Sequence, residues 1–226
     1  MFGVLSRRSV HVIVAAALVL LSAPAHARHH RKHKQPTPLA GAFDYYVLSL
    51  SWSPEHCAAG ARHADDPQCA TPRRYGFVLH GLWPQYESGY PQSCATGVSL
   101  SSTTVDSMLD VMPNPQLVRH EWSKHGTCSG LTPEAYFATA RTAYTAVKIP
   151  APYNAPPTAF QTSASDIEQA FRGANAGLEP SETAVLCAGK FLQEVRVCLD
   201  KNLHPRPCGR DVRDACKGSI IVRPIK

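Results

Sequence analysis

The sequence predicts an α+β fold in a single disulfide-bonded domain. Segments with strand patterns are interspersed with helical ones, and no regular βαβ alternation connects them. Residues 43–226 contain eight cysteines and no internal linker, so we expect one domain there. The apolar content of 44% and the charged content of 18% are ordinary for a globular chain of 226 residues. They exclude wholesale disorder, collagen and coiled coil.

Two predicted segments precede this domain. Residues 1–27 have the pattern of a secretory signal peptide, with two arginines, a mostly apolar run and an A-x-A cleavage site. The run at residues 10–21 is shorter than the ~20 residues of a membrane-spanning helix, so we expect cleavage and no membrane anchor. Residues 28–42 begin with a basic tract rich in His and Pro, which predicts a disordered tail.

The net charge of +6 comes from these two segments. They contain six of the 23 basic residues, which leaves 17 basic against 17 acidic residues in the rest of the chain. A polyanion would therefore have to bind at a local site, because the domain offers no bulk positive charge.

Five segments of the domain have strand patterns. Residues 45–52 are apolar and rich in β-formers, which is typical of a buried strand. Residues 75–79 are a second candidate that ends at His80. In the last third, residues 185–186, 191–199 and 220–222 are candidates, and the second of these alternates apolar and polar side chains.

Four segments have helix patterns. Residues 105–112 predict a short helix that two prolines stop. Residues 117–125 predict a helix that Gly126 caps. A Thr-Pro pair starts a helix over residues 132–147, and a capping box starts a short one over residues 165–171.

All eight cysteines follow the predicted signal peptide. An even number in an exported chain indicates four disulfides formed in an oxidising compartment, although spacing alone leaves their pairing open. No C-x-x-C pair occurs, so a structural zinc site is not expected. We expect no metal and no cofactor.

Two segments carry candidate chemistry, GFVLHGLWPQ at residues 76–85 and RHEWSKHGTC at residues 119–128. On a helix, His120 and Lys124 share one stripe, and Glu121 and His125 share the next. All four side chains can therefore face one cleft. Such a cluster suits an anionic substrate, because Lys supplies positive charge and His transfers protons near neutral pH.

A zinc-protease motif is excluded in the second segment. H-E-x-x-H places its second His four residues after the first, where this chain has Lys124, and His125 is one residue further on. In the first segment, His80 taken alone favours a buried structural histidine over a catalytic one. Trp83 next to it could either stack on a base or pack in the core.

Together, the two segments resemble the two active-site signatures of the ribonuclease T2 family. FVLHGLWPQ is similar to the first signature and HEWSKHGTC to the second, and His125 lies 45 positions after His80. The segment YYVLSLSWSP and the four cysteines near the C-terminus are similar to bacterial members. The resemblance implies a mainly antiparallel central sheet packed with helices.

The resemblance also implies an activity and roles for five residues. The family cleaves single-stranded RNA by attack of the 2′-OH on the adjacent phosphate, through a 2′,3′-cyclic phosphate and without a metal. His125 would be the general base and His80 the general acid. His120 would hold the phosphate, and Glu121 and Lys124 would stabilise the transition state. DNA lacks the 2′-OH and should not be cleaved.

Base recognition and disulfide pairing follow from the same resemblance. Trp83 is the one base-binding residue that it implies. Ser51 and Gln85 depart from the residues found in plant and fungal members, which leaves the preferred base open. The leading hypothesis is an RNase of broad base specificity. The implied disulfides are Cys57–Cys69, Cys94–Cys128, Cys187–Cys216 and Cys198–Cys208.

Other interpretations stay open. A T2-like scaffold without activity could serve as a binding module, and a metal-dependent hydrolase could use the same His and Glu cluster. A purely structural disulfide-rich secreted domain would need no such cluster. The leader, the cysteines and the absence of an N-x-S/T sequon favour a periplasmic or secreted bacterial protein, which we expect to be a monomer with RNA as its partner.

Overall fold

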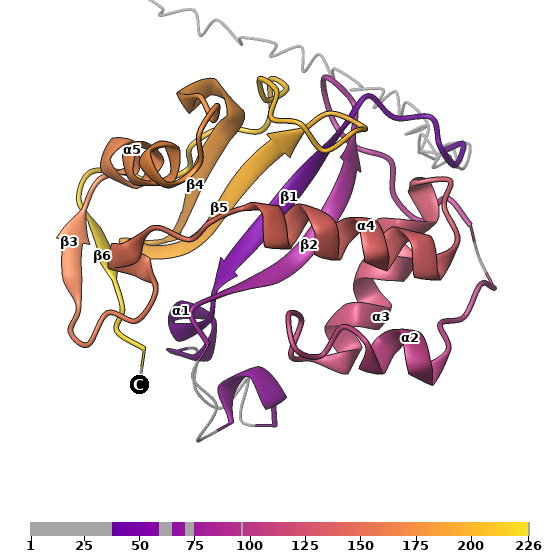
Figure 1. Ribbon diagram of the computed structural model, residues 1–226, viewed down its shortest axis with the longest axis horizontal. Helices are drawn as coiled ribbons and strands as arrows, with labels where there is room; N and C mark the ends of the chain where they lie inside the picture. The colour runs from indigo at the N-terminus through magenta and orange to yellow at the C-terminus, as the bar shows by residue number, and fades with distance from the viewer. Residues whose placement is uncertain (1–37, 59–64, 71–74, 96, 226) are drawn as a thin grey trace, which may run out of the picture. The chain divides into compact units, whose positions relative to one another are not determined.

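The computed structural model describes residues 38–58, 65–70, 75–95 and 97–225. The predicted signal peptide and residues 28–37 of the predicted tail lie outside the described residues. The described part is an α+β fold, as predicted, with one central sheet and helices around it (Figure 1). Within the described residues, no helix is long and apolar enough to span a bilayer.

The sheet has six strands. Their order is β2-β1-β5-β6-β3, and β4 pairs with residues 191–197 of β5 on the edge opposite β1. All pairs are antiparallel except β5 with β6, which confirms the mainly antiparallel sheet. The strands are β1 (Tyr45–Trp52), β2 (Phe77–Gln85), β3 (Phe160–Thr162), β4 (Thr183–Ala188), β5 (Phe191–Leu199) and β6 (Ile220–Val222).

In the described part of the chain, five α-helices lie around this sheet. In Figure 1, α4 crosses the face of β1 and β2, α3 lies beside β2, α2 lies beside α3, and α5 lies beside β4. The helices are α1 (Ser53–Ala58), α2 (Ser102–Asp106), α3 (Pro115–Lys124), α4 (Pro133–Ala146) and α5 (Ala164–Ala174). Short 3₁₀ turns follow at Pro67–Cys69, Gly126–Cys128, Ala151–Tyr153 and Pro180–Glu182.

Strand β1 is buried on both faces, because its side chains alternate between two apolar clusters. Leu48, Leu50 and Trp52 face the large core beneath the helices. Tyr45 and Val47 face a smaller cluster on the other side of the sheet. The site described below lies on this second side, which Ser49 and Ser51 continue with small side chains.

Strand β2 is longer than predicted. It does not end at His80 but continues to Gln85, and Pro84 is tolerated because β2 is an edge strand. Ser49 of β1 pairs with Gly81 and Leu50 pairs with Leu79, so His80 is the extra residue of a β-bulge. A bulge reorients the side chain that it contains, and bulges are common beside active sites.

Three helix predictions need correction. The helix predicted over residues 105–112 is instead α2, because the Ser101 side chain caps it by accepting a hydrogen bond from the Thr104 amide. The capping box of α5 uses Ser163 and Asp166, so this helix begins at Ala164 and ends at Ala174. Gly126 does not cap α3 in a left-handed conformation. His125 caps the helix, and Gly126 begins a 3₁₀ turn.

Two further predictions differ from the structure. Strand β3 was not predicted, since its three residues carry no clear pattern and pair only with β6. The predicted tail reached residue 42, but the Gly41 amide donates to the carbonyl of Cys128 and the Ala42 amide donates to that of Leu39. The last residues of that segment are therefore joined to the domain.

Helix α3 is capped at its start and tied to a neighbouring loop after its end. The Asn114 side chain accepts hydrogen bonds from the amides of Gln116 and Leu117, and Pro115 takes the first helical position. At the other end, the Cys94–Cys128 disulfide ties the turn after α3 to the loop after β2. The structure has all four disulfides of the implied pairing, Cys57–Cys69, Cys94–Cys128, Cys187–Cys216 and Cys198–Cys208.

We expect Gly126→Ala to destabilise the domain. A Cβ at this position would collide with Cε3 of the buried Trp122 ring and would lie 3.0 Å from Cδ1 of Tyr136. Overpacking of this kind costs about 1–3 kcal/mol, which urea unfolding of the oxidised protein would measure. The matched control is Gly173→Ala in α5, where a Cβ meets nothing within 4 Å. Equal stability of the two variants would contradict the prediction.

Candidate active site

The two signature segments meet in one cavity of about 300 Å³. Strand β2 contributes His80, Trp83 and Gln85, and helix α3 with its C-cap contributes the second group. Strand β5 and the segment after it complete the wall. The lining residues are His80, Trp83, Gln85, Tyr90, His120, Glu121, Lys124, His125, Arg196, Asp211 and Val212. The structure therefore brings together all six residues that the sequence and the resemblance singled out.

His80 is held between two carboxylates. Its Nδ1 lies 3.1 Å from Oε2 of Glu194, and its Nε2 lies 3.8 Å from Oε1 of Glu121. Burial alone would lower the pKa of His80. The hydrogen bond with Glu194 and the negative charges of both carboxylates outweigh burial, so the pKa of His80 is raised above its usual value. Near neutral pH, this imidazole is suited to donate a proton.

His125 lies in the opposite environment. It is the C-cap of α3, it is 4% exposed, and burial together with the positive charges of Lys124, His120 and His80 lowers its pKa to about 3. Its ring is stacked on Trp83, with ring centroids 5.1 Å apart. Among the described residues, Nδ1 of His125 is buried and has no hydrogen-bond partner. The imidazole is therefore neutral near neutral pH and suited to accept a proton.

Glu121 is buried between α3 and β2. Burial raises the pKa of this carboxyl to about 7, even though His80, Trp83 and Lys124 favour its ionised form. The indole Nε1 of Trp83 donates a hydrogen bond to Oε2 of Glu121 at 2.6 Å. The backbone of Gly81 permits this contact, because a Cβ there would collide with the same oxygen.

His120 and Lys124 form the more open side of the cavity, one turn apart on α3. Burial, followed by the charges of Lys124 and His80, lowers the pKa of His120. Nζ of Lys124 lies 6.0 Å from the ring centroid of Tyr90. Both side chains can therefore meet an anion that enters from solvent.

The Trp83 side chain contacts other protein groups on several sides. Its Nε1 donates to Glu121, its ring is stacked on His125, and the guanidinium carbon of Arg196 lies 5.1 Å from its ring centroid. Tyr90 offers a freer aromatic surface, because it is 45% exposed and its ring centroid is 6.0 Å from that of His125. Base stacking by Trp83 remains a prediction.

Four polar or aromatic residues of the site were not predicted. Tyr90 and Asp211 come from loops, and Glu194 and Arg196 come from β5. In the sequence, Glu194 and Arg196 read as polar positions of an alternating strand. No local signal marks the Glu194 side chain as buried, since that depends on which strands flank β5.

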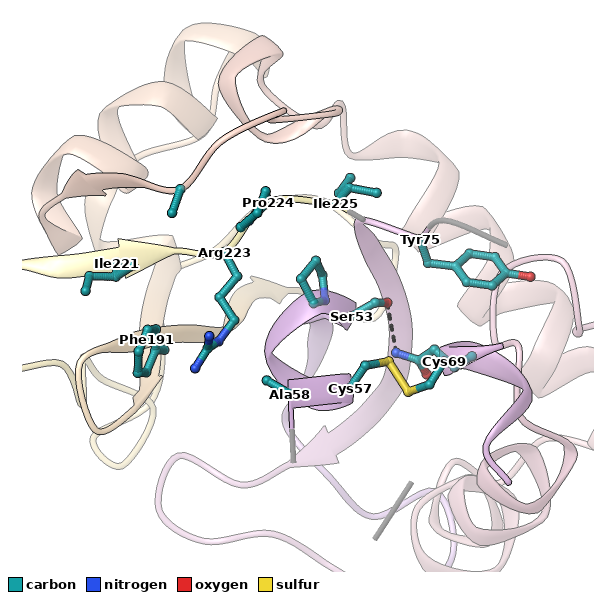
Figure 2. Close-up of a pocket in the computed structure, with 13 residues that line it drawn as sticks. Ser53, Cys57, Ala58, Cys69, Tyr75, Phe191, Ile221, Arg223, Pro224 and Ile225 are labelled. Atoms are coloured by element: carbon teal, nitrogen blue, oxygen red, sulfur yellow. Dashed lines mark hydrogen bonds between the residues drawn. A yellow bond between two sulfur atoms is a disulfide. The ribbon is translucent and has the colours of Figure 1, made fainter. Parts of the chain in front are cut away.

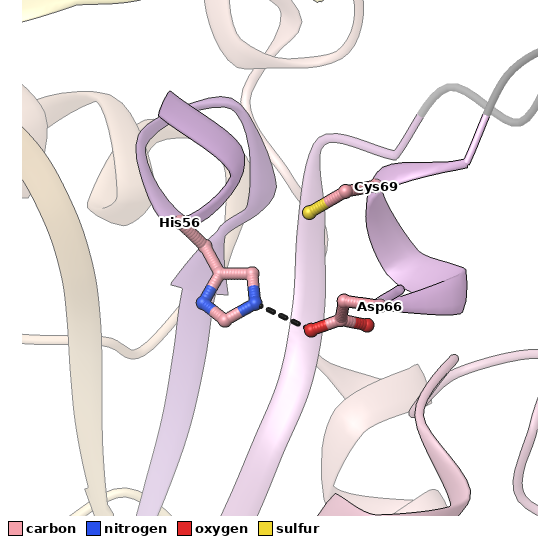
Figure 3. A group of neighbouring side chains, drawn as sticks. All are labelled: His56, Asp66 and Cys69. Atoms are coloured by element: carbon pink, nitrogen blue, oxygen red, sulfur yellow. Dashed lines mark hydrogen bonds and ion pairs between the residues drawn. The ribbon is translucent and has the colours of Figure 1, made fainter. Parts of the chain in front are cut away.

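A second group of potential metal ligands does not form a metal site. His56, Asp66 and Cys69 lie close together, and Nε2 of His56 is 2.8 Å from Oδ2 of Asp66 (Figure 3). The sulfur of Cys69 is bonded to Cys57, so it is no thiolate and cannot ligate a metal in that form.

A larger cavity of about 540 Å³ lies between α1, the Cys57–Cys69 disulfide and the last described residues (Figure 2). Its lining is mostly apolar. The charged residue in this lining, Arg223, forms an ion pair with Glu55 and lies over the Phe191 ring. Because the described lining contains neither a histidine nor a carboxylate, this cavity lacks the acid–base groups of the first one.

The low pKa of His125 predicts a specific pH dependence of stability. Because the unfolded chain binds this proton near pH 6.5 and the folded chain near pH 3, the stabilisation is complete above pH 6.5 and is lost as pH falls toward 3. The His125→Asn variant has no imidazole at this position, so its stability does not decrease with pH for this reason. As pH falls below about 6, the free energy of unfolding of the wild type should therefore decrease relative to that of the variant, by up to about 1.4 kcal/mol per pH unit.

Urea unfolding at pH 7, 5.5 and 4 measures this change. The raised pKa of Glu121 makes the folded protein more stable as pH falls, which is the opposite effect. Because Glu121 is present in both the wild type and the variant, its contribution largely cancels from their difference. His204→Asn is the matched control, because the His204 side chain is 77% exposed. A difference between wild type and His125→Asn that does not vary with pH would contradict the prediction.

Comparison with known proteins identifies the family. The model of the Ribonuclease T2 family matches residues 43–208. A "Ribonuclease" of Aeromonas hydrophila is 56% identical over 93 residues, which are 41% of this chain and 41% of that protein, so the match spans less than half the relative's length. "Ribonuclease DdI" of Dictyostelium discoideum is 30% identical over 200 residues, covering 80% of this chain and 84% of that protein.

A solved structure agrees on the fold. Ribonuclease MC1 from the seeds of bitter gourd superposes with a TM-score of 0.61 at 24% identity, covering 79% of this chain and 99% of that one. The family match covers nearly all of the described domain and includes both signature segments. This chain therefore belongs to the ribonuclease T2 family.

Proposed function

We propose that the protein is an exported, metal-independent endoribonuclease that cleaves single-stranded RNA by 2′-OH transphosphorylation. The observation that carries the proposal is the pair of histidines in one cavity with opposite protonation states. The pKa of His80 is raised by two carboxylates, and that of His125 is lowered by burial among cations. A reaction that needs one acid and one base at the same pH is served by such a pair.

In the proposed reaction, His125 is the general base. Its Nδ1 is buried, so Nε2 is the ring nitrogen that can meet a ligand. Nε2 takes the proton of the ribose 2′-OH, and the resulting oxyanion attacks the adjacent phosphorus. His80 protonates the departing 5′-oxygen from Nε2. The products are a 2′,3′-cyclic phosphate and a free 5′-OH end.

The remaining residues act on the charge of the phosphate. His120 and Lys124 lie on the open side of the cavity, where they would hold the non-bridging oxygens as negative charge develops. The Glu121 carboxyl, with a pKa of about 7, is partly protonated near neutral pH. In that form it can donate a hydrogen bond to a phosphoryl oxygen.

We propose that base binding is broad. Exposed Tyr90 provides a π-face that any base can stack on, and Trp83 supports the site from within. Four disulfides and the predicted leader support export to the periplasm or the medium, since disulfides persist in oxidising compartments.

The experiment that tests the proposal is digestion of RNA and matched single-stranded DNA by the oxidised mature protein in excess EDTA. We expect RNA fragments ending in 2′,3′-cyclic phosphate or 3′-phosphate, and intact DNA. Cleavage that returns only on addition of metal would favour a metal-dependent hydrolase. RNA binding without cleavage by folded protein, from acid to alkaline pH, would favour a binding module.

We expect His80→Ala and His125→Ala each to lower the rate of RNA cleavage by about 10²–10⁴-fold, the usual contribution of a general acid or base. His204→Ala, at an exposed histidine outside the cavity, is the control and should cleave at the wild-type rate. Cleavage on a dinucleotide substrate gives the rates, and circular dichroism shows whether each variant is folded. A folded His80→Ala variant with full activity would rule out the acid role.

A further inference from the structure

Glu194 of β5 is a buried carboxylate that contacts the proposed general acid, His80. It is 5% exposed, and each of its oxygens has one side-chain partner. Oε2 lies 3.1 Å from Nδ1 of His80, and Oε1 lies 2.5 Å from Nε of Arg196. A buried carboxylate is unfavourable unless it is paired, and the contacts with His80 and Arg196 both favour the ionised form of Glu194.

The sheet is built so that His80 and Glu194 can meet across β1. Strand β1 lies between β2 and β5, which places the two residues on strands that are not neighbours. Arg196 is paired with Ser49, and Glu194 is paired with Ser51. These small serine side chains leave the space above β1 open to the longer side chains on either side.

The β-bulge makes this contact necessary. Because His80 is the unpaired residue of the bulge, the ladder of β1 and β2 does not by itself fix the direction of its ring. The hydrogen bond to Glu194 does. A carboxylate accepts, so Nδ1 of His80 carries the hydrogen, and Nε2 is left facing the cavity as the nitrogen whose proton is exchanged.

We propose that Glu194 is the positioning residue of the general acid, which holds the His80 ring through Nδ1–H and stabilises its imidazolium form. This inference rests on the proposed ribonuclease function for its effect on rate, but the His80–Glu194 pair can be tested without activity. Arg196 completes the arrangement by keeping Glu194 ionised.

Several charged groups besides Glu194 face His80. On the side of the active-site cavity, β5 contributes Arg196, and helix α3 with its C-cap contributes His120, Glu121, Lys124 and His125. His80 also borders a neighbouring cavity, which is lined by His56 and Asp66. Glu121 and Glu194 raise the pKa of His80, and Arg196 lowers it. Of the two carboxylates, only Glu194 is within hydrogen-bond distance of the ring.

The test is Glu194→Gln, which keeps the shape and removes the charge. His80 should then titrate at least about one unit lower, since an adjacent opposite charge is worth about 1–3 units. The alkaline limb of the kcat/KM profile, which reports the protonated acid, should move to lower pH by the same amount. At neutral pH, kcat should fall about 10–100-fold, the usual effect of losing a partner that orients a functional histidine, with little change in KM.

Histidine-resolved NMR titration, assigned with His80→Ala, measures the pKa directly. The matched control is Glu182→Gln, which removes another buried carboxylate, one bonded to the Glu179 amide and outside the cavity. This control should leave the His80 titration and the pH profile in place. If Glu194→Gln also leaves both in place, the inference is overturned.

A measurement on the wild type covers the case in which Glu194→Gln does not fold. Nitrogen-15 shifts should show neutral His80 as the Nδ1–H tautomer, and the Nε2–H tautomer would overturn the inference. If wild type shows the expected tautomer and titration but does not cleave RNA, the proposed function fails while the His80–Glu194 pair stands. If the wild type cleaves RNA but His80 is the Nε2–H tautomer, the proposed function stands and the inference about Glu194 fails.

Discussion

The close approach of helix α3 to strand β2 at Gly81 is the constraint on which the site depends. The Glu121 carboxylate lies so near the backbone of Gly81 that any side chain there would collide with it, and Trp83 donates a hydrogen bond to the same oxygen. This contact buries Glu121 between helix and strand. It also sets the distance from His80 to His120, Lys124 and His125, because all three lie within four residues of Glu121 along α3 and its C-cap.

Burial and neighbouring charges at this contact shift the pKa values of Glu121, His80 and His125. Glu121 is protonated more readily than an exposed carboxyl, with a pKa of about 7. The two histidines respond in opposite directions, because their neighbours have opposite charges. His80 faces Glu194 and Glu121, whereas His125 faces cations and an indole. One cavity thus contains a proton donor and a proton acceptor of the same residue type, separated in pKa by their surroundings alone.

The rest of the fold keeps this contact in place. The buried strand β1 supports β2 from one side, and Tyr136 of α4 donates a hydrogen bond to the carbonyl of Leu82. The Cys94–Cys128 disulfide closes the turn after α3. A disulfide stabilises chiefly by restricting the unfolded chain, so it adds stability without taking part in the geometry of the reaction.

The sequence by itself determined the fold class, the two signature segments and the cluster on α3. These depend on local pattern: helical spacing brings His120, Glu121, Lys124 and His125 together whatever the helix packs against. Strands β5 and β6 were predicted with their observed bounds, because apolar or alternating residues continue over their whole length. The start of α2 and the capping box of α5 were misplaced because several Ser, Thr and Asp residues near each helix start can act as the cap.

Only the tertiary structure decided how His80 is held and which other residues join it. The β-bulge at His80 depends on the register between β1 and β2, which no local pattern specifies. Glu194 lies 114 residues away in the sequence and reaches His80 only because β5 flanks β1 and two serines leave room. The pKa values of Glu121 and His125 depend on burial and on neighbours from other elements. These are long-range properties, so they appear only when the strands and α3 are assembled.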